Sequence, residues 1–240
     1  MRFLDAPGLE PAEELAWEES RLESLNSGDT GESLRFWETE YPCVVVGLAN
    51  RVEGEVNTAA CKEASIPIFR RVSGGGTVLQ GPGCLNYSLT LRIVEGGPLD
   101  SVNGANELIL NRIRAALGSI IQERVELCGH TDLAIGGRKF SGNAQKRKRN
   151  ALLFHGTLLL PDFNLDSIGQ ILRTPPMQPD YREGRTHSDF VRSFPTQRDE
   201  AVQALRKAWG AKDADDSAPN EAIAQLVREK YSQDDWNLRR

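Results

Sequence analysis

The stretch RRVSGGGTVLQGPGCLNYSL, residues 70–89, places two arginines before three consecutive glycines and ends in an alternating apolar run. Gly74–Gly76 carry no Cβ, so their backbone can adopt positive φ and present N–H groups to an anion. The guanidinium groups of Arg70 and Arg71 suit a phosphate or a carboxylate. The spacing matches neither a Walker loop nor GxGxxG. Two interpretations remain: a glycine-rich hairpin with solvated arginines, or a loop that wraps around a charged ligand.

Hydrophobic patterning around this loop predicts a mixed series of strands and helices. Residues 124–161 are expected to form a strand, a Gly136-Gly137 hairpin, a second strand, a basic turn and a third strand. Elsewhere we expect helices over 12–25, 58–66, 102–121, 198–209 and 221–231, a polar loop over 210–221, and strands over 33–40, 43–49, 66–72 and 84–93. The pattern favours an α+β fold, in which helices pack on a mixed, largely antiparallel β-sheet, over strict βαβ alternation.

Composition bounds the class of protein. The chain has 240 residues, 39% hydrophobic and 26% charged, which is typical of a globular protein. A net charge of −5 argues against a dedicated nucleic-acid binder. The longest apolar run, CVVVGLA, is too short to span a bilayer, and the N-terminus lacks the apolar core of a signal peptide. We therefore expect a cytoplasmic protein that binds neither nucleic acid nor membrane.

A second motif, GGRKFSGNAQ, carries a candidate catalytic group. Lys139 lies on the strand that leaves the predicted hairpin, where its charge could counter a developing negative charge on a phosphate or a carbonyl oxygen. Ser141 and Gly142 would allow close backbone approach. The alternative is an ordinary exposed lysine on a strand.

The basic run KRKR, residues 146–149, is either a solvated turn or a docking patch for an acidic partner or a phosphate-bearing substrate. His155, at the head of an apolar strand, is expected to be a structural residue, and His130 could pair with Asp132. The four cysteines include no CxxC pair, so neither a disulfide framework nor a zinc site is indicated. Cys128 remains a candidate nucleophile, because nearby lysine and arginine would lower the pKa of its thiol.

The motifs RRVSGGG, GCLNYSL, GRKFSGNAQ and FHGTLLL occur in this order, and their order is more specific than any one of them. The chain resembles the lipoate–protein ligase family, within the wider group of biotin and lipoate ligases and octanoyltransferases. The resemblance covers most of the chain. It implies one catalytic domain over residues 1–240 with the biotin/lipoate ligase fold, related to class II aminoacyl-tRNA synthetases. It also implies that the C-terminal accessory domain of many bacterial ligases is missing, so a separate accessory subunit could be needed.

The same resemblance implies site residues. Lys139 would act at the reactive centre as the catalytic residue. The nucleotide and acyl group would be bound by Lys139 together with Arg71, Gly75, Gly76, Thr77, Val78 and Leu79. Other substrate contacts are implied for Arg70, Ser73, Gln80, Asn86, Ser141, Gly142 and His155, and no metal-ligating residue is implied. Gln80 departs from the pattern, since many ligases carry a histidine there.

The implied reaction has two steps: lipoate or octanoate reacts with ATP and Mg²⁺ to give acyl-AMP, and a lysine of a lipoyl domain then attacks it. Acceptors would be E2 subunits of 2-oxoacid dehydrogenases, the glycine cleavage H protein or similar proteins. The protein would act by positioning and charge stabilisation. One alternative is a transferase that uses Cys128 and an acyl thioester without ATP, and another is a non-catalytic lipoyl-binding subunit. The absence of a Gly-Arg-Gly-Arg loop places biotin behind lipoate.

Overall fold

Two long antiparallel strands form the centre of the main sheet in the computed structural model, which describes residues 1–4, 9–214 and 220–239. β6 (Cys84–Arg92) pairs with β10 (Ala151–Leu159) along nine residues, from Cys84 opposite Leu159 to Arg92 opposite Ala151. The eight-stranded sheet has the order β11-β1-β2-β6-β10-β9-β8-β7. Its remaining strands are β1 (Arg2–Leu4), β2 (Ser33–Trp37), β7 (Glu126–Cys128), β8 (Asp132–Ile135), β9 (Arg138–Arg147) and β11 (Lys212–Asp213).

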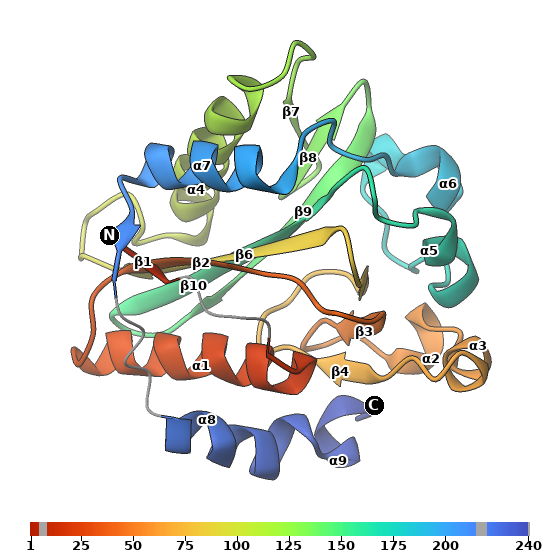
Figure 1. The fold of residues 1–240 in the computed structure, drawn as a ribbon, viewed down its shortest axis with the longest axis horizontal. Coiled ribbons are helices and arrows are strands. Elements are labelled where there is room, and N and C mark those ends of the chain that lie inside the picture. Colours follow the sequence, from red (N-terminus) through yellow and green to blue (C-terminus); the bar gives the residue numbers. More distant parts are fainter. Residues whose placement is uncertain (5–8, 215–219, 240) are drawn as a thin grey trace.

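Helices cover both faces of this sheet (Figure 1). α4 (Val102–Gly118) and α7 (Arg198–Trp209) lie on one face, and α1 (Pro11–Ser27) lies on the other, with α8 (Asn220–Leu226) packed against the outer side of α1. β1 is parallel to β2 and β11, and all other neighbours in the sheet are antiparallel. The predicted α+β class, with helices packed on a mixed and largely antiparallel sheet, is confirmed.

A second, three-stranded sheet carries the glycine loop. β3 (Cys43–Val46) lies between β4 (Ile68–Arg70), to which it is parallel, and β5 (Val78–Gln80), to which it is antiparallel. The loop over residues 71–77 therefore leaves one edge strand of this sheet and returns as the other. β2 and β3, expected as neighbouring strands joined by a turn, belong to different sheets, and β5 was not predicted at all.

The period of two along the central strands separates an apolar from a partly polar face. On β6, Leu85, Tyr87, Leu89 and Leu91 pack in the core beneath α4 and α7, as do Leu152, Phe154 and Leu158 on β10. The opposite face of β6 carries Asn86, Ser88 and Thr90, and that of β10 carries His155 and Thr157, all buried. The face toward α1 therefore combines apolar packing with buried polar groups beneath the helix.

Several elements differ from the sequence prediction. The strand expected before the Gly136-Gly137 hairpin is split into β7 and β8, because Gly129 turns the chain with a φ of 56°. The helix expected over 221–231 is α8 followed by a π-helical turn, Val227–Tyr231. Part of the loop expected over 210–221 lies outside the described residues.

The helix expected over 58–66 is α3 (Thr58–Glu63). The sequence prediction missed the short strands β1 and β11, and β11 lies within the segment expected to be a polar loop. It also missed α2 (Val52–Glu55), α5 (Asp166–Ile171), α6 (His187–Phe190), α9 (Asp234–Asn237) and a 3-10 turn, Asp180–Arg182. None of the helices in the described ranges is long and apolar enough to cross a bilayer.

A buried ion pair ties α1 to the sheet. The carboxylate of Glu14 and the guanidinium of Arg35 are bonded to each other, and both side chains are fully buried. The same guanidinium lies 4.5 Å from the centre of the Trp17 ring. Burial is the largest influence on the Glu14 carboxyl and raises its pKa, although Arg35 opposes this.

Removing one partner of this pair should destabilise the fold strongly. Glu14→Ala leaves the charge of Arg35 buried, and we expect the free energy of unfolding to fall by about 3–5 kcal/mol. Glu23→Ala on the same helix breaks the exposed ion pair with Lys148 and should cost less than about 1 kcal/mol. Urea unfolding of both variants measures the difference, and equal losses would contradict this account.

Candidate active site

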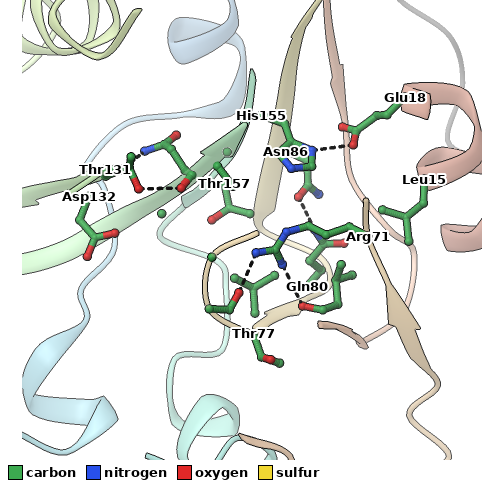
Figure 2. A pocket seen from close by; sticks show the side chains of 18 of the residues that line it. Leu15, Glu18, Arg71, Thr77, Gln80, Asn86, Thr131, Asp132, His155 and Thr157 are labelled. Atoms are coloured by element: carbon green, nitrogen blue, oxygen red, sulfur yellow. Dashed lines mark hydrogen bonds and ion pairs between the residues drawn. The ribbon is translucent and has the colours of Figure 1, made fainter. Parts of the chain in front are cut away.

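A cavity of about 130 Å³ lies where α1, the glycine loop and the start of β9 meet (Figure 2). Its apolar lining comes from Leu15, Trp37, Val45 and Val78. Asp132 and Lys139 line another part of the wall, and the loop residues Gly75–Val78 also line it. A cavity of this size is smaller than the roughly 300–1,000 Å³ of typical ligand pockets.

Arg71 shapes the glycine loop from within. Its Nη2 donates to the carbonyl oxygens of Gly74 (2.6 Å) and Gly76 (2.8 Å), and its Nε donates to Ser73 Oγ (3.0 Å). Nη1 donates to the carbonyl of Val45 on β3 (3.2 Å). Burial lowers the pKa of Arg71 to about 10. Most of its donors are thus committed to the protein, and the guanidinium determines the path of the loop.

Residues outside the motif hold the loop from the other side. Gly75, at a φ of 86°, accepts a hydrogen bond from Asn50 Nδ2 at 3.0 Å. The carboxylate of Glu55 accepts from Asn50 (2.8 Å) and from the Thr77 amide (3.1 Å) and hydroxyl (2.5 Å). A Cβ on Gly47 would overlap the carbonyl oxygen of Gly75. Asn50 and Glu55 could not be predicted from the sequence, because each contacts the loop across more than 20 residues.

Lys139 is held at the cavity wall by an ion pair. Its Nζ lies 2.8 Å from Asp132 Oδ1, and Tyr181 OH donates to Asp132 Oδ2, also at 2.8 Å. Burial and the neighbouring carboxylate raise the pKa of Tyr181. A Cβ on Gly142 would lie 2.8 Å from Lys139 Nζ, so a glycine leaves room for the ammonium group. Asp132 therefore pairs with Lys139 and Tyr181, rather than with His130 as suggested by the sequence.

His155 links α1 to the glycine loop. Its Nδ1 lies 2.6 Å from Glu18 Oε2, and its Nε2 lies 2.5 Å from Ser73 Oγ. Trp37 Nε1 donates to the other oxygen of Glu18 at 3.4 Å. Glu18 was not among the predicted site residues, although it shares the helix face of Leu15 and Leu22, where a charged residue is unusual.

Gln80 and Asn86 form an amide pair in the cavity wall. Gln80 Nε2 donates to Asn86 Oδ1 at 2.6 Å, and Asn86 Nδ2 donates to the carbonyls of Trp37 (3.3 Å) and Cys84 (3.2 Å). Both residues line the cavity with Thr157. Gln80, which replaces the histidine of many ligases, thus lies in the cavity wall and is hydrogen-bonded to Asn86.

Five of the residues singled out in the sequence do not line the cavity: Arg70, Ser73, Leu79, Cys128 and Ser141. Arg70 is fully buried and donates to carbonyls of Gly47 (2.9 Å), Trp236 (3.0 Å) and Arg239 (2.8 Å). Its guanidinium thus joins the C-terminal segment to β4 instead of facing a ligand, and burial lowers its pKa. Ser141 is also buried, on the opposite side of β9 from Gly142.

Cys128 has the opposite electrostatic environment to the one expected. The thiol is half-buried at the end of β7, and burial together with Glu126 and Asp132 raises its pKa. The expectation that neighbouring cations lower this pKa is wrong, because burial and the carboxylates of Glu126 and Asp132 raise it, and Lys139 is paired with Asp132.

Comparison with known proteins identifies the family. A model described as the lipoyl protein ligase A/B catalytic domain matches residues 10–203, and the chain belongs to this family. It is 26% identical over 259 residues to lipoate-protein ligase LplJ of Bacillus subtilis, covering 100% of this chain and 74% of the relative. It is 24% identical over 274 residues to octanoyltransferase LipM of Brevibacillus brevis, covering 100% and 99%.

Solved structures share the fold. A putative lipoate protein ligase of T. acidophilum with bound lipoic acid matches with a TM-score of 0.79 at 22% identity, over 99% of this chain and 97% of that one. Lipoate-protein ligase A bound with ATP matches with a TM-score of 0.79 at 24% identity, over 99% and 98%. A bi-partite ligase of Thermoplasma acidophilum, studied with its E2 lipoyl domain, matches with a TM-score of 0.78 at 23% identity, over 99% and 95%. The biotin/lipoate ligase-type fold expected from the sequence is thereby confirmed.

The raised pKa of Cys128 predicts a slow thiol. At pH 7.5, iodoacetamide should alkylate Cys128 more slowly than it alkylates N-acetylcysteine, because less thiolate is present. The rate should continue to rise above pH 9. Peptide mass spectrometry gives the site, and Cys128→Ala shows the contribution of the three buried cysteines. Alkylation faster than that of the free thiol would indicate an activated nucleophile instead.

Proposed function

We propose that the protein is an ATP-dependent lipoate–protein ligase. It activates lipoate or octanoate as the acyl-adenylate and transfers the acyl group to a lysine of a lipoyl-domain protein. The observation that carries this proposal is the position of Lys139, whose ammonium group lies beside Asp132 in the wall of a partly apolar cavity bordered by the glycine loop.

The cavity has an apolar part that suits an acyl chain and a polar part that suits a phosphate. Leu15, Trp37 and Val45 offer apolar surface to an alkyl chain or a dithiolane ring. Lys139 offers a positive charge, and the loop Gly75–Thr77 offers backbone that can approach a phosphate closely. The acyl chain would therefore lie along α1, with its carboxylate and the phosphate near Lys139.

In the first step a carboxylate oxygen of the acid attacks the α-phosphorus of ATP, and pyrophosphate leaves. In the second step the neutral amine of the acceptor lysine attacks the acyl carbonyl, AMP leaves, and the amide forms as the nitrogen loses a proton. Lys139 would stabilise negative charge on the phosphate in both steps. Neither step needs a nucleophile from the protein, and holding the two reactants in line supplies much of the acceleration.

ATP and lipoate as substrates are supported by relatives of the same fold that bind them. Mg²⁺ would accompany the phosphates of ATP, largely coordinated by phosphate oxygens and water. Both oxygens of Asp132, the carboxylate in the cavity wall, are already bonded to Lys139 and Tyr181, and the described residues contain no cluster of metal-ligating side chains.

A second candidate function is acyl transfer from a thioester through Cys128, without ATP. The octanoyltransferase relatives favour it. The raised pKa of Cys128 and its position outside the cavity lining favour the ligase. A non-catalytic lipoyl-binding subunit is the third candidate, because it would need only the cavity.

Lipoyl-domain proteins, such as E2 subunits and the glycine cleavage H protein, are the acceptors that this function implies. The bi-partite relative supports a separate accessory subunit as a further partner. A single catalytic domain over residues 1–240, cytoplasmic location and the absence of a nucleic-acid partner stay predictions.

The decisive assay combines the protein with lipoate, ATP, Mg²⁺ and an apo lipoyl domain, and follows the mass of the acceptor. Lys139→Ala should slow acyl-AMP formation by about 10²–10³-fold, as expected when one charge-stabilising group is removed. Lys148→Ala, on the same strand–turn unit, is the matched control and should retain the rate. Cys128→Ala should also retain it.

Two results would contradict the ligase. Transfer from octanoyl-carrier protein without ATP, abolished by Cys128→Ala, would establish the transferase. Tight binding of lipoyl-AMP with no acylated acceptor, including with an added accessory subunit, would establish the binding subunit.

The basic run at residues 146–149 is divided by the structure. Arg147 donates to the carbonyls of Leu99 (2.7 Å) and Asp100 (2.9 Å), and Lys148 pairs with Glu23 at 2.6 Å. Lys146 and Arg149 are therefore the charges that we propose for docking of an acidic lipoyl domain.

Charge reversal at these two positions tests the docking surface. Lys146→Glu with Arg149→Glu should raise the KM for the acceptor severalfold at low salt, while the rate of acyl-AMP formation stays unchanged. The effect should shrink as salt is added, because exposed charges are screened. An unchanged acceptor KM would mean that the run is a solvated turn.

A further inference from the structure

A continuous chain of hydrogen bonds connects α1 to the glycine loop through the wall of the cavity. Glu18, on α1, contacts His155 on β10, and His155 contacts Ser73, which contacts Arg71. Figure 2 shows Glu18 and His155 facing each other, with Arg71 reaching into the loop. Glu18, His155, Ser73 and Arg71 are between 1% and 9% exposed, so water competes little for these bonds.

The donors and acceptors in this series of hydrogen bonds can be assigned from the chemistry of the side chains. An ionised Glu18 can only accept, so the proton on His155 Nδ1 points toward it, and Nε2 of the neutral ring is an acceptor. Ser73 Oγ accepts from Arg71 Nε, because a guanidinium can only donate, and its own proton is then free for His155 Nε2. With a neutral ring protonated at Nδ1, each of these three hydrogen bonds has one donor and one acceptor.

We call the hydrogen-bonded series Glu18–His155–Ser73–Arg71 the relay, and it ends on the glycine loop. Arg71 donates to the carbonyls of Gly74 and Gly76, on either side of Gly75. A displacement of His155 would release Ser73, and a displaced Ser73 would release one side of the Arg71 guanidinium. The position of the loop over the cavity therefore depends on a carboxylate on a distant helix.

We propose that Glu18, through His155 and Ser73, is a positioning residue that fixes the glycine loop in the geometry needed for acyl activation. This role rests on the proposed ligase function, although the ordering of the loop does not depend on which reaction occurs. Glu18 lies on α1, 52 positions before Arg70, and is therefore not part of the loop motif.

The Glu–His–Ser arrangement resembles that of a catalytic triad, but the geometry assigns it a different role. Ser73 is 1% exposed, does not line the cavity, and accepts a hydrogen bond from Arg71. A nucleophile must reach the acyl carbon, and Ser73 Oγ has no open side toward the cavity. Ser73 therefore links His155 to Arg71 and does not act as a nucleophile on the acyl carbon.

The first test measures the loop without reference to activity. Hydrogen exchange of the amides over residues 71–80 should be faster by about tenfold or more in Glu18→Ala and Ser73→Ala. Glu18→Gln keeps an acceptor for His155 Nδ1 and should return exchange close to wild type. Ser73→Ala removes one oxygen atom, so it remains informative if the other alanine variant does not fold.

The matched control is Glu14→Gln. Glu14 is another buried carboxylate of α1, one helical turn before Glu18, but it bonds Arg35 and not the relay. Glu14→Gln should lower the global stability. The ratio of amide exchange rates between residues 71–80 and β6 should stay at its wild-type value. Unchanged loop exchange in both alanine variants, or the same loop loosening in Glu14→Gln, would overturn the proposal.

The second test connects the relay to the reaction. Glu18→Ala and Ser73→Ala should slow acyl-AMP formation by about 10–100-fold, the scale expected for displaced reacting groups, with rescue in Glu18→Gln. Transfer from preformed lipoyl-AMP should suffer less. A covalently acylated Ser73 found by peptide mass spectrometry would overturn the positioning role. If the wild-type protein forms no acyl-AMP, the proposed function fails, and the exchange measurements still decide the relay.

Discussion

The buried guanidinium of Arg71 is the constraint on which the site depends. A charge removed from water must be satisfied by hydrogen bonds and an opposite charge, or the fold loses several kcal/mol. The carbonyls of Val45, Gly74 and Gly76 meet most of this need, which forces the loop to curl around the side chain. Glu18 supplies an opposite charge through His155 and Ser73. The loop is thus ordered from inside, before any ligand binds.

The two sheets contribute different parts of the site around Arg71. The large sheet presents the polar face of β6 and β10 beneath α1, and the small sheet delivers both ends of the glycine loop to the same edge. Lys139 reaches the cavity from a third direction, at the start of β9, where Asp132 and Tyr181 hold it. The Lys139 ammonium group and the loop are therefore positioned by independent parts of the fold.

The ordered motifs predicted the family and the α+β architecture, and most long elements fell near their expected bounds. Only part of the site could be predicted from the sequence. Lys139, Gly142 and His155 were found because their motifs are local in sequence. Glu18, Asn50, Glu55 and Tyr181 were missed because each acts across a large sequence separation. Cys128 was misjudged because the pKa of a thiol depends on which charges lie near it in space.

Local features follow from the amino-acid sequence: the alternation that divides β6 and β10 into two faces, and the glycines that permit positive φ at Gly75. The different roles of Arg70 and Arg71, which are adjacent and chemically identical, depend on tertiary contacts. Strand pairing directs one guanidinium to the C-terminal segment and the other into the loop. The physical reason is that burial and the choice of hydrogen-bond partners are set by segments up to 169 positions apart in the chain.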